Sequence, residues 1–259
     1  MSGRGPPPRV LVVAGLDPSG GAGLLADLAA LRAVGASGWA VASALTAQGP
    51  GRGRGTEPTT PAFLLDQIEA LLSGRERPRA VKTGMLGSAA LALALADRLA
   101  EAPLSRTTLV MDPVLASSSG LPLLELGGLG LADALGPLLR RARVATPNLP
   151  ELAALTGCDV TGEEGAIAAA RELPARAVLV KGGHREGEPV DLLVEGRRVT
   201  RLAGRRRPWT ARGTGCRLAS AMAGLLARGE PLESAARRAK RAVERYLDAS
   251  RPGRAGGWS

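Results

Sequence analysis

The 259-residue sequence predicts an α/β protein, a three-layer α/β/α sandwich built around a mostly parallel central sheet. Two observations support this fold class. Short apolar runs bounded by glycine or proline alternate with longer stretches of helical pattern from end to end, which is typical of βαβ units. The apolar runs are also continuous, and this indicates that helices cover both faces of the sheet.

The individual elements follow in order along the chain. Strands are expected at residues 9–14, 39–46, 80–83, 108–111, 143–146 and 177–181. Helices are expected at residues 23–34, 61–72, 89–100, 129–140, 151–156 and 163–172. Residues 190–194 and 197–202 then predict a late antiparallel hairpin, and helices at 214–227 and 232–249 follow it. The Arg-Gly stretch at residues 51–55 is expected to be a surface loop.

The chain is expected to form one domain over residues 1–259. No internal repeat or long linker divides it, and residues 1–8 and 251–259 are expected to be disordered tails. No apolar run reaches the ~20 residues that cross a bilayer, and the first residues lack the apolar segment of a signal peptide. Two cysteines cannot build a disulfide framework in a chain of this length. These features predict a cytoplasmic protein with free thiols and no membrane partner.

The formal charge of +10 raises the question of nucleic-acid binding. Nearly all of this charge is arginine, in a chain also rich in Ala, Gly and Pro, and G/C-rich codons explain that balance. Aromatic residues make up only 2% of the chain, which leaves little for base stacking. We therefore expect no nucleic-acid partner. The same bias makes the rare residue types informative, and Lys181, the sole asparagine Asn148 and the sole histidine His184 all fall inside the candidate motifs described below.

Polar and glycine-rich segments lie at the carboxyl ends of six predicted strands, at residues 15–23, 46–48, 82–85, 112–114, 146–151 and 181–184. Because ligands bind beyond the carboxyl ends of the strands in such sheets, we expect the rim of the active site there. The P-loop, dinucleotide, zinc and G-x-S-x-G signatures are all absent from the sequence. Their absence excludes the corresponding classes of site.

Gly213-Thr214-Gly215-Cys216 begins an apolar helix. Glycines at a helix start let the backbone approach an anion, which the free N–H groups and the helix dipole then favour. In this first turn Cys216 is expected to have a lowered pKa. The alternative is an ordinary helix start with a buried cysteine.

Four further positions are candidates for holding phosphate and metal. Asp112 after one strand, and Asn148 with Glu151 after the next, offer the oxygen ligands that Mg²⁺ prefers. The alternative for Asn148 and Glu151 is an N-terminal cap on the following helix. Lys181, followed by two glycines, is suited to neutralise phosphates, or else it is a solvated lysine at a strand end.

Taken together, seven segments resemble one family, the hydroxymethylpyrimidine/phosphomethylpyrimidine kinases of thiamine biosynthesis in the ribokinase superfamily. They are AGLDPSGGAGLLADL at residues 14–28, ALTAQ at 44–48, KTGML at 82–86, DPVLASSSG at 112–120, TPNLPE at 146–151, VKGGH at 180–184 and GTGC at 213–216. The resemblance implies a ribokinase-like fold, ATP as co-substrate and Mg²⁺. It also implies phosphorylation of 4-amino-5-hydroxymethyl-2-methylpyrimidine and then of its monophosphate, and a homodimer is common among relatives.

The resemblance implies a role for each matching residue. The acceptor pyrimidine would be bound by Gly15, Asp27, Gln48, Met85 and Val114. Mg²⁺ would be organised by Asp112 and Glu151, and the nucleotide phosphates bound by Asn148, Lys181 and Thr214. The catalytic set would be Lys181 with the anion hole of Gly213, Gly215 and Cys216.

Some points stay open within this resemblance. Many relatives in the wider superfamily carry a catalytic Asp where this chain has Cys216, so Cys216 either removes a proton or only shapes the anion hole. A loose transition state needs little base assistance. The family motif His-Gly-Thr-Gly-Cys-Thr reads Arg212-Gly-Thr-Gly-Cys-Arg217 here. The alternative functions are a pyridoxal/pyridoxine kinase of the same branch and a non-catalytic pyrimidine-binding protein on the same fold.

Overall fold

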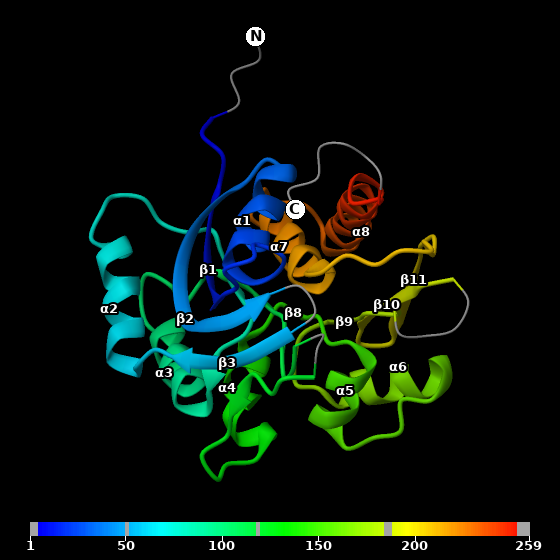
Figure 1. The fold of residues 1–259 in the computed structure, drawn as a ribbon, viewed down its shortest axis with the longest axis horizontal. Coiled ribbons are helices and arrows are strands. Elements are labelled where there is room, and N and C mark those ends of the chain that lie inside the picture. The colour runs from blue at the N-terminus through cyan, green and yellow to red at the C-terminus, as the bar shows by residue number, and fades with distance from the viewer. Residues whose placement is uncertain (1–4, 50–51, 118–119, 184–187, 253–259) are drawn as a thin grey trace.

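A nine-stranded sheet lies between two layers of helices in the computed structural model, which describes residues 5–49, 52–117, 120–183 and 188–252 (Figure 1). The strands of this sheet are β1 (Arg9–Leu16), β2 (Ser37–Gly49), β3 (Arg52–Pro58), β4 (Ala80–Thr83), β6 (Thr108–Met111), β8 (Val144–Ala145), β9 (Val178–Val180), β10 (Val190–Glu195) and β11 (Arg198–Ala203). The helices are α1 (Gly23–Ala33), α2 (Pro61–Leu72), α3 (Ala89–Ala100), α4 (Leu131–Arg141), α5 (Leu149–Thr156), α6 (Gly162–Glu172), α7 (Thr214–Ala227) and α8 (Leu232–Ala249). A small second sheet pairs β5 (Gly87–Ser88) with β7 (Leu124–Glu125). The predicted three-layer α/β/α class is confirmed.

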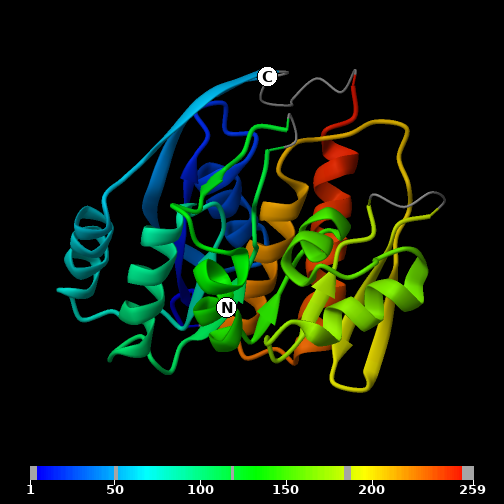
Figure 2. The ribbon, with the colours of Figure 1, turned by 90° about the horizontal axis from the view of Figure 1, so that it is seen from below.

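The order of the strands in the sheet is β11-β10-β9-β8-β6-β4-β1-β2-β3. The six strands from β9 to β2 run parallel, and β3 at one edge and β10–β11 at the other are antiparallel. Figure 2 shows these two edges on opposite sides of the molecule. The chain builds from β1 first toward β3 and then, from β4, toward β11, so the order reverses between β1 and β4. Such a switch point is where open α/β sheets bind their ligands.

The two faces of the sheet carry separate hydrophobic cores. Side chains of β1 alternate between them, with Leu11 and Val13 on one face and Val10 and Val12 on the other. Helices α2, α3, α4, α5 and α6 cover the first face, and α1, α7 and α8 cover the second (Figure 1). This arrangement confirms that the continuous apolar runs are strands buried on both faces.

The predicted bounds of α2, α3, α7 and α8 agree with the structure at both ends. Local capping explains this for two of them. Thr60 accepts a hydrogen bond from the backbone N–H of Phe63 and precedes a proline at the first helical position, and Ser88 caps α3 in the same way. Signals of this kind fix helix starts without tertiary information.

The prediction of a surface loop at residues 51–55 is wrong for the residues that the structure describes. Arg52–Pro58 is strand β3, paired antiparallel with the far end of β2. Its sequence, RGRGTEP, has neither the alternation nor the β-branched content of a strand. The long β2 supplies the ladder partners, and the register shifts at a bulge between Ala47 and Gln48.

Several predictions fall partly or wholly outside the described residues. Of the expected tails at 1–8 and 251–259, only residues 5–8 and 251–252 are described, and the backbone N–H of Ser37 donates to the carbonyl of Pro8 at 3.0 Å. His184 also lies outside the described residues. In the described part of the chain, no helix is both long enough and apolar enough to cross a membrane.

Candidate active site

Three charged side chains from separate parts of the sequence meet beyond the carboxyl ends of β6, β8 and β9. Lys181 follows β9, and its Nζ lies 2.8 Å from Asp112 Oδ1 and 3.4 Å from Glu151 Oε2. Asp112 follows β6, and Thr146, after β8, donates its hydroxyl to Asp112 Oδ1 at 3.1 Å. The side chains of Asp112 and Glu151 are 1% and 9% exposed, so this charge cluster is almost removed from solvent.

Burial and mutual attraction set the pKa values in this cluster. Burial lowers the pKa of Lys181, but Asp112 and then Glu151 raise it by more, so the ammonium is held in its charged form. Burial raises the pKa of Glu151, against the opposing effect of Lys181. The alternative of a solvated lysine at a strand end is wrong, because the Lys181 side chain is only 14% exposed.

The cap predicted for α5 is confirmed, and it also places Glu151 in the cluster. Asn148 Oδ1 accepts from the backbone N–H of Glu151, and Glu151 Oε2 accepts from the backbone N–H of Asn148, both at 2.8 Å. This is a complete capping box. The same Oε2 faces Lys181, so the cap and the charge cluster share one carboxylate oxygen.

The glycine turn before α7 faces this lysine. Gly213 has φ of 71° and caps the helix, and a Cβ added to it would lie 2.2 Å from the carbonyl oxygen of Gly21. A Cβ on Gly215 would lie 3.1 Å from Lys181 Nζ. Thr214 and Gly215 thus begin the 14-residue α7 beside a buried ammonium, with first-turn N–H groups that have no intrahelical partner. A helix start with this geometry is suited to an anion.

Cys216 is half-buried in the first turn of α7, and the prediction of a lowered pKa is wrong. Burial raises the pKa of the thiol to about 11, and Asp27 and Asp112 add to this effect. Lys82 and a hydrogen bond with the backbone of Gly23 oppose the rise but do not cancel it. A pKa raised in this way favours the protonated thiol at neutral pH.

We expect alkylation of Cys216 by iodoacetamide to be slow at pH 8 and to accelerate as the pH approaches 11, because the thiolate is the nucleophile. Cys158→Ser as background leaves one thiol, and mass spectrometry of its peptide after short pulses gives the rate at each pH. A reaction rate that titrates near pH 7 would contradict the raised pKa.

Part of the predicted acceptor pocket comes together near the switch point. Met85, after β4, lies so close to Gly15, near the end of β1, that a Cβ on Gly15 would sit 2.7 Å from the Met85 sulfur. Val114 joins Met85 in a small apolar cluster with Ala44 of β2. Gln48 is half-buried further along β2, and its side chain makes no hydrogen bond to any described residue. An amide with unused donors and acceptors is suited to a polar ligand.

Asp27 lies deeper than the sequence predicts. Its side chain is 0% exposed, and both carboxylate oxygens accept from Lys82 Nζ at 2.9 Å. Ser220 of α7 donates to Oδ1 at 2.8 Å. In this structure the carboxylate is bonded within the protein and has no surface open to a ligand. Sequence reasoning missed Lys82 and Ser220, although lysine is rare enough here for Lys82 to stand out.

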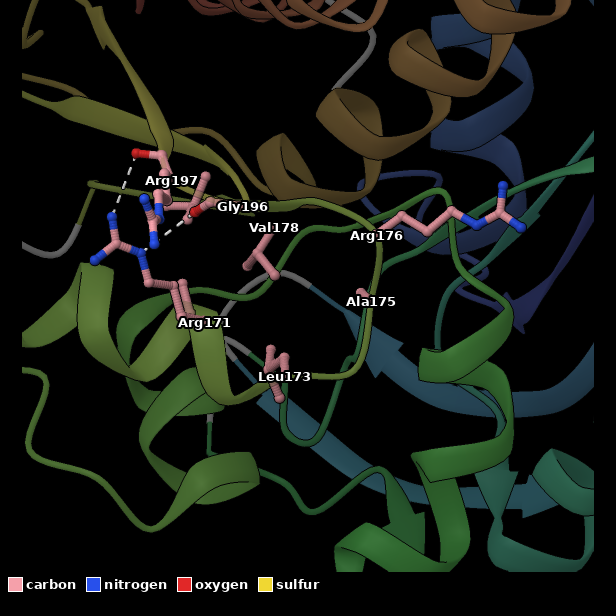
Figure 3. A pocket seen from close by; sticks show the side chains of 9 residues that line it. Arg171, Leu173, Ala175, Arg176, Val178, Gly196 and Arg197 are labelled. Carbon is pink, nitrogen blue, oxygen red and sulfur yellow. Dashed lines mark hydrogen bonds between the residues drawn. The ribbon is translucent and has the colours of Figure 1, made fainter.

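A cavity of about 760 Å³ lies at the opposite end of the strands, between α6, the start of β9 and the β10–β11 turn (Figure 3). Arg171, Arg176 and Arg197 line it. Arg171 donates to the carbonyl oxygens of Gly196 and Arg197, whereas Figure 3 shows Arg176 extending away from the other two. The guanidinium groups do not converge, and no residue of the charge cluster lines this cavity. It is not the candidate active site.

Comparison with known proteins identifies the family. The sequence matches the model of the phosphomethylpyrimidine kinases over residues 17–257. The chain belongs to the phosphomethylpyrimidine kinase family. This confirms the predicted family and the predicted class of enzyme, a phosphotransferase.

Relatives of this chain within the phosphomethylpyrimidine kinase family differ in length. The chain is 40% identical to the hydroxymethylpyrimidine/phosphomethylpyrimidine kinase of Streptomyces coelicolor, covering 95% of this chain and 91% of that protein. It is 41% identical to the thiamine biosynthesis bifunctional protein ThiED of Geobacter sulfurreducens, and the match covers 96% of this chain but spans only 51% of that protein.

Solved structures give the same fold. A phosphomethylpyrimidine kinase from Clostridium difficile is 32% identical with a TM-score of 0.77, covering 93% of this chain and 99% of that one. A pyridoxal kinase from Staphylococcus aureus in complex with pyridoxal is 28% identical with a TM-score of 0.81, covering 93% of this chain and 87% of that one. Fold similarity alone therefore does not distinguish a pyrimidine kinase from a pyridoxal kinase.

Proposed function

We propose that this chain transfers the γ-phosphoryl group of ATP to 4-amino-5-hydroxymethyl-2-methylpyrimidine and then to its monophosphate. The observation that carries the proposal is the meeting of Lys181, Asp112 and Glu151 with the glycine turn at the carboxyl edge of the sheet. The apolar cluster around Met85 lies at the switch point of the same sheet and offers a site for a flat ring. The names of the sequence relatives support the pyrimidine as acceptor.

Each group has a physical role in such a transfer. The Lys181 ammonium neutralises charge on the transferring phosphoryl group, and the N–H groups of Thr214 and Gly215 hold its oxygens. Cys216, protonated at neutral pH, shapes this anion hole rather than acting as base. Phosphoryl transfer passes through a loose transition state, so positioning and charge stabilisation provide most of the catalysis.

The residues present fit Mg²⁺. Asp112 Oδ1 and Glu151 Oε2 face Lys181, and no described residue donates a hydrogen bond to Asp112 Oδ2 or Glu151 Oε1. Two nearby carboxylates with free oxygens suit an ion that takes one or two protein ligands and keeps its waters. The described residues contain no group of three or more His, Cys, Asp or Glu that could hold a metal ion. When bound, the ion would neutralise charge on the phosphates.

The test is ADP release from Mg-ATP by purified protein with hydroxymethylpyrimidine, its monophosphate, pyridoxal or no acceptor. Turnover of both pyrimidines is expected. Turnover of pyridoxal alone would instead favour the pyridoxal kinase activity known for the S. aureus neighbour. No acceptor-dependent release would leave a non-catalytic pyrimidine-binding protein as the better explanation.

The domain organisation, cellular location and oligomeric state of this chain are also proposals. One kinase domain over the whole chain is consistent with the single nine-stranded sheet. A cytoplasmic location stays a prediction, and the homodimer implied by the resemblance can be tested by light scattering after size-exclusion chromatography.

A further inference from the structure

Arg212 joins two segments that are far apart in the sequence. It precedes the glycine turn of α7, and its Nη2 lies 3.0 Å from Oδ2 of Asp17, which follows β1. Its Nη1 donates to the hydroxyl of Ser19 at 2.9 Å. One guanidinium thus contacts two residues of the loop between β1 and α1, here called the first loop (residues 17–22).

The Asp17 carboxylate organises this first loop and is itself buried, with 3% of its side chain exposed. It accepts hydrogen bonds from the backbone N–H and hydroxyl of Ser19, at 3.0 and 2.7 Å, and from the backbone N–H of Ala22 at 3.1 Å. Arg212 is the cation paired with this buried negative charge. Without Arg212, the carboxylate would keep its hydrogen bonds within the first loop but would lose its cationic partner.

The first loop and the glycine turn are in direct contact. Any Cβ on Gly213 would collide with the carbonyl oxygen of Gly21 at 2.2 Å. A hydrogen bond also joins the backbone of Gly23, directly after the first loop, to Cys216. On its other side, the carbonyl oxygen of Arg212 accepts from the hydroxyl of Tyr246 in α8 at 3.1 Å. A displacement of the first loop would therefore reach the anion hole.

We propose that Arg212 is a positioning residue for phosphoryl transfer. It holds the first loop against the glycine turn and neutralises Asp17, so that the anion hole keeps its shape and a phosphate meets no unpaired carboxylate. The inference rests on the proposed function and deepens it. Arg212 stands at the position where the motif of the resemblance described above has His.

The experiment compares Arg212→Gln, Arg212→Lys, Asp17→Asn and the double variant Asp17→Asn/Arg212→Gln with the wild type. Arg212→Gln is expected to lower kcat about ten- to a hundred-fold with little change in the KM for ATP, because a misplaced anion hole costs rate more than binding. Arg212→Lys should recover part of the loss. The double variant should be no slower than Arg212→Gln alone, since the two residues act as one unit.

The matched control is Arg207→Gln. Arg207 precedes α7 on the same segment and is also ion-paired, with its Nη2 2.9 Å from Asp248 Oδ2, but it does not contact the first loop. Its variant should keep wild-type kcat. Hydrogen exchange of peptides covering residues 17–23 should speed up in Arg212→Gln and not in Arg207→Gln.

Wild-type kcat and wild-type exchange in Arg212→Gln, or additive losses in the double variant, would overturn the inference. The exchange measurement needs no substrate. If the wild type turned over none of the acceptors, the proposed function would fail, while faster exchange in Arg212→Gln alone would still support the positioning contact.

Discussion

Replacing Lys181 with methionine is expected to lower kcat by about a thousand-fold while the protein stays folded. The methionine keeps the length of the side chain but removes the charge that lies 2.8 Å from Asp112 and faces the glycine turn. The transferring phosphoryl group then loses its buried cation, and the carboxylates of Asp112 and Glu151 lose their shared partner. ADP release under saturating Mg-ATP and acceptor measures the loss, and thermal unfolding followed by circular dichroism confirms the fold.

Two variants sharpen this prediction. Lys181→Arg keeps the charge, but the planar guanidinium does not reproduce a compact ammonium, so most of the loss should persist. Arg143→Gln removes a half-exposed ion pair with Glu195, away from the charge cluster, and should keep wild-type kcat. Wild-type turnover by Lys181→Met would show that this lysine has no part in the transfer.

The bounds of helices and strands can be predicted from the sequence where signals close in the sequence determine them. Strands β4 and β6 and four helices have the predicted bounds because buried apolar runs, caps and prolines are local signals. Strand β3 is not predictable from its own residues, because it forms by pairing with the long strand β2 beside it. The arrangement of the site follows from the topology, since segments that end parallel strands must meet at one edge.

What the sequence could not predict is burial and pairing across long distances. Asp27 and Lys82 are 55 positions apart, and only the folded chain places both below the surface in contact. The prediction of a lowered pKa for Cys216 is wrong for the same reason, because the sequence does not show how deeply the thiol is buried. A helix start lowers a thiol pKa, but burial beside Asp27 and Asp112 raises it by more. The contact of Arg212 with Asp17 likewise joins residues that are far apart in the sequence.

The second large effect is expected from Lys82→Met, which should destabilise the folded protein by about 3–5 kcal/mol. Lys82 and Asp27 are both 0% exposed, and the methionine leaves Asp27 buried with only the hydroxyl of Ser220 as partner. Urea unfolding measures the loss. Asp27→Leu/Lys82→Met replaces both charges with apolar groups and should recover much of the stability, because the burial of an unpaired charge is the main cost.

The pH dependence of this loss distinguishes an unpaired carboxyl from simple repacking. Burial already raises the pKa of Asp27 against the opposing effect of Lys82, and removing Lys82 raises it further. A group whose folded pKa lies above its unfolded value stabilises the fold below the unfolded pKa, near 4, and that contribution is lost as the pH rises through the folded pKa. Lys82→Met should therefore be closer to wild-type stability at pH 5 than at pH 8. The double variant should lack this trend, and an equal loss at both pH values in Lys82→Met would mean that a cavity rather than an unpaired charge destabilises it.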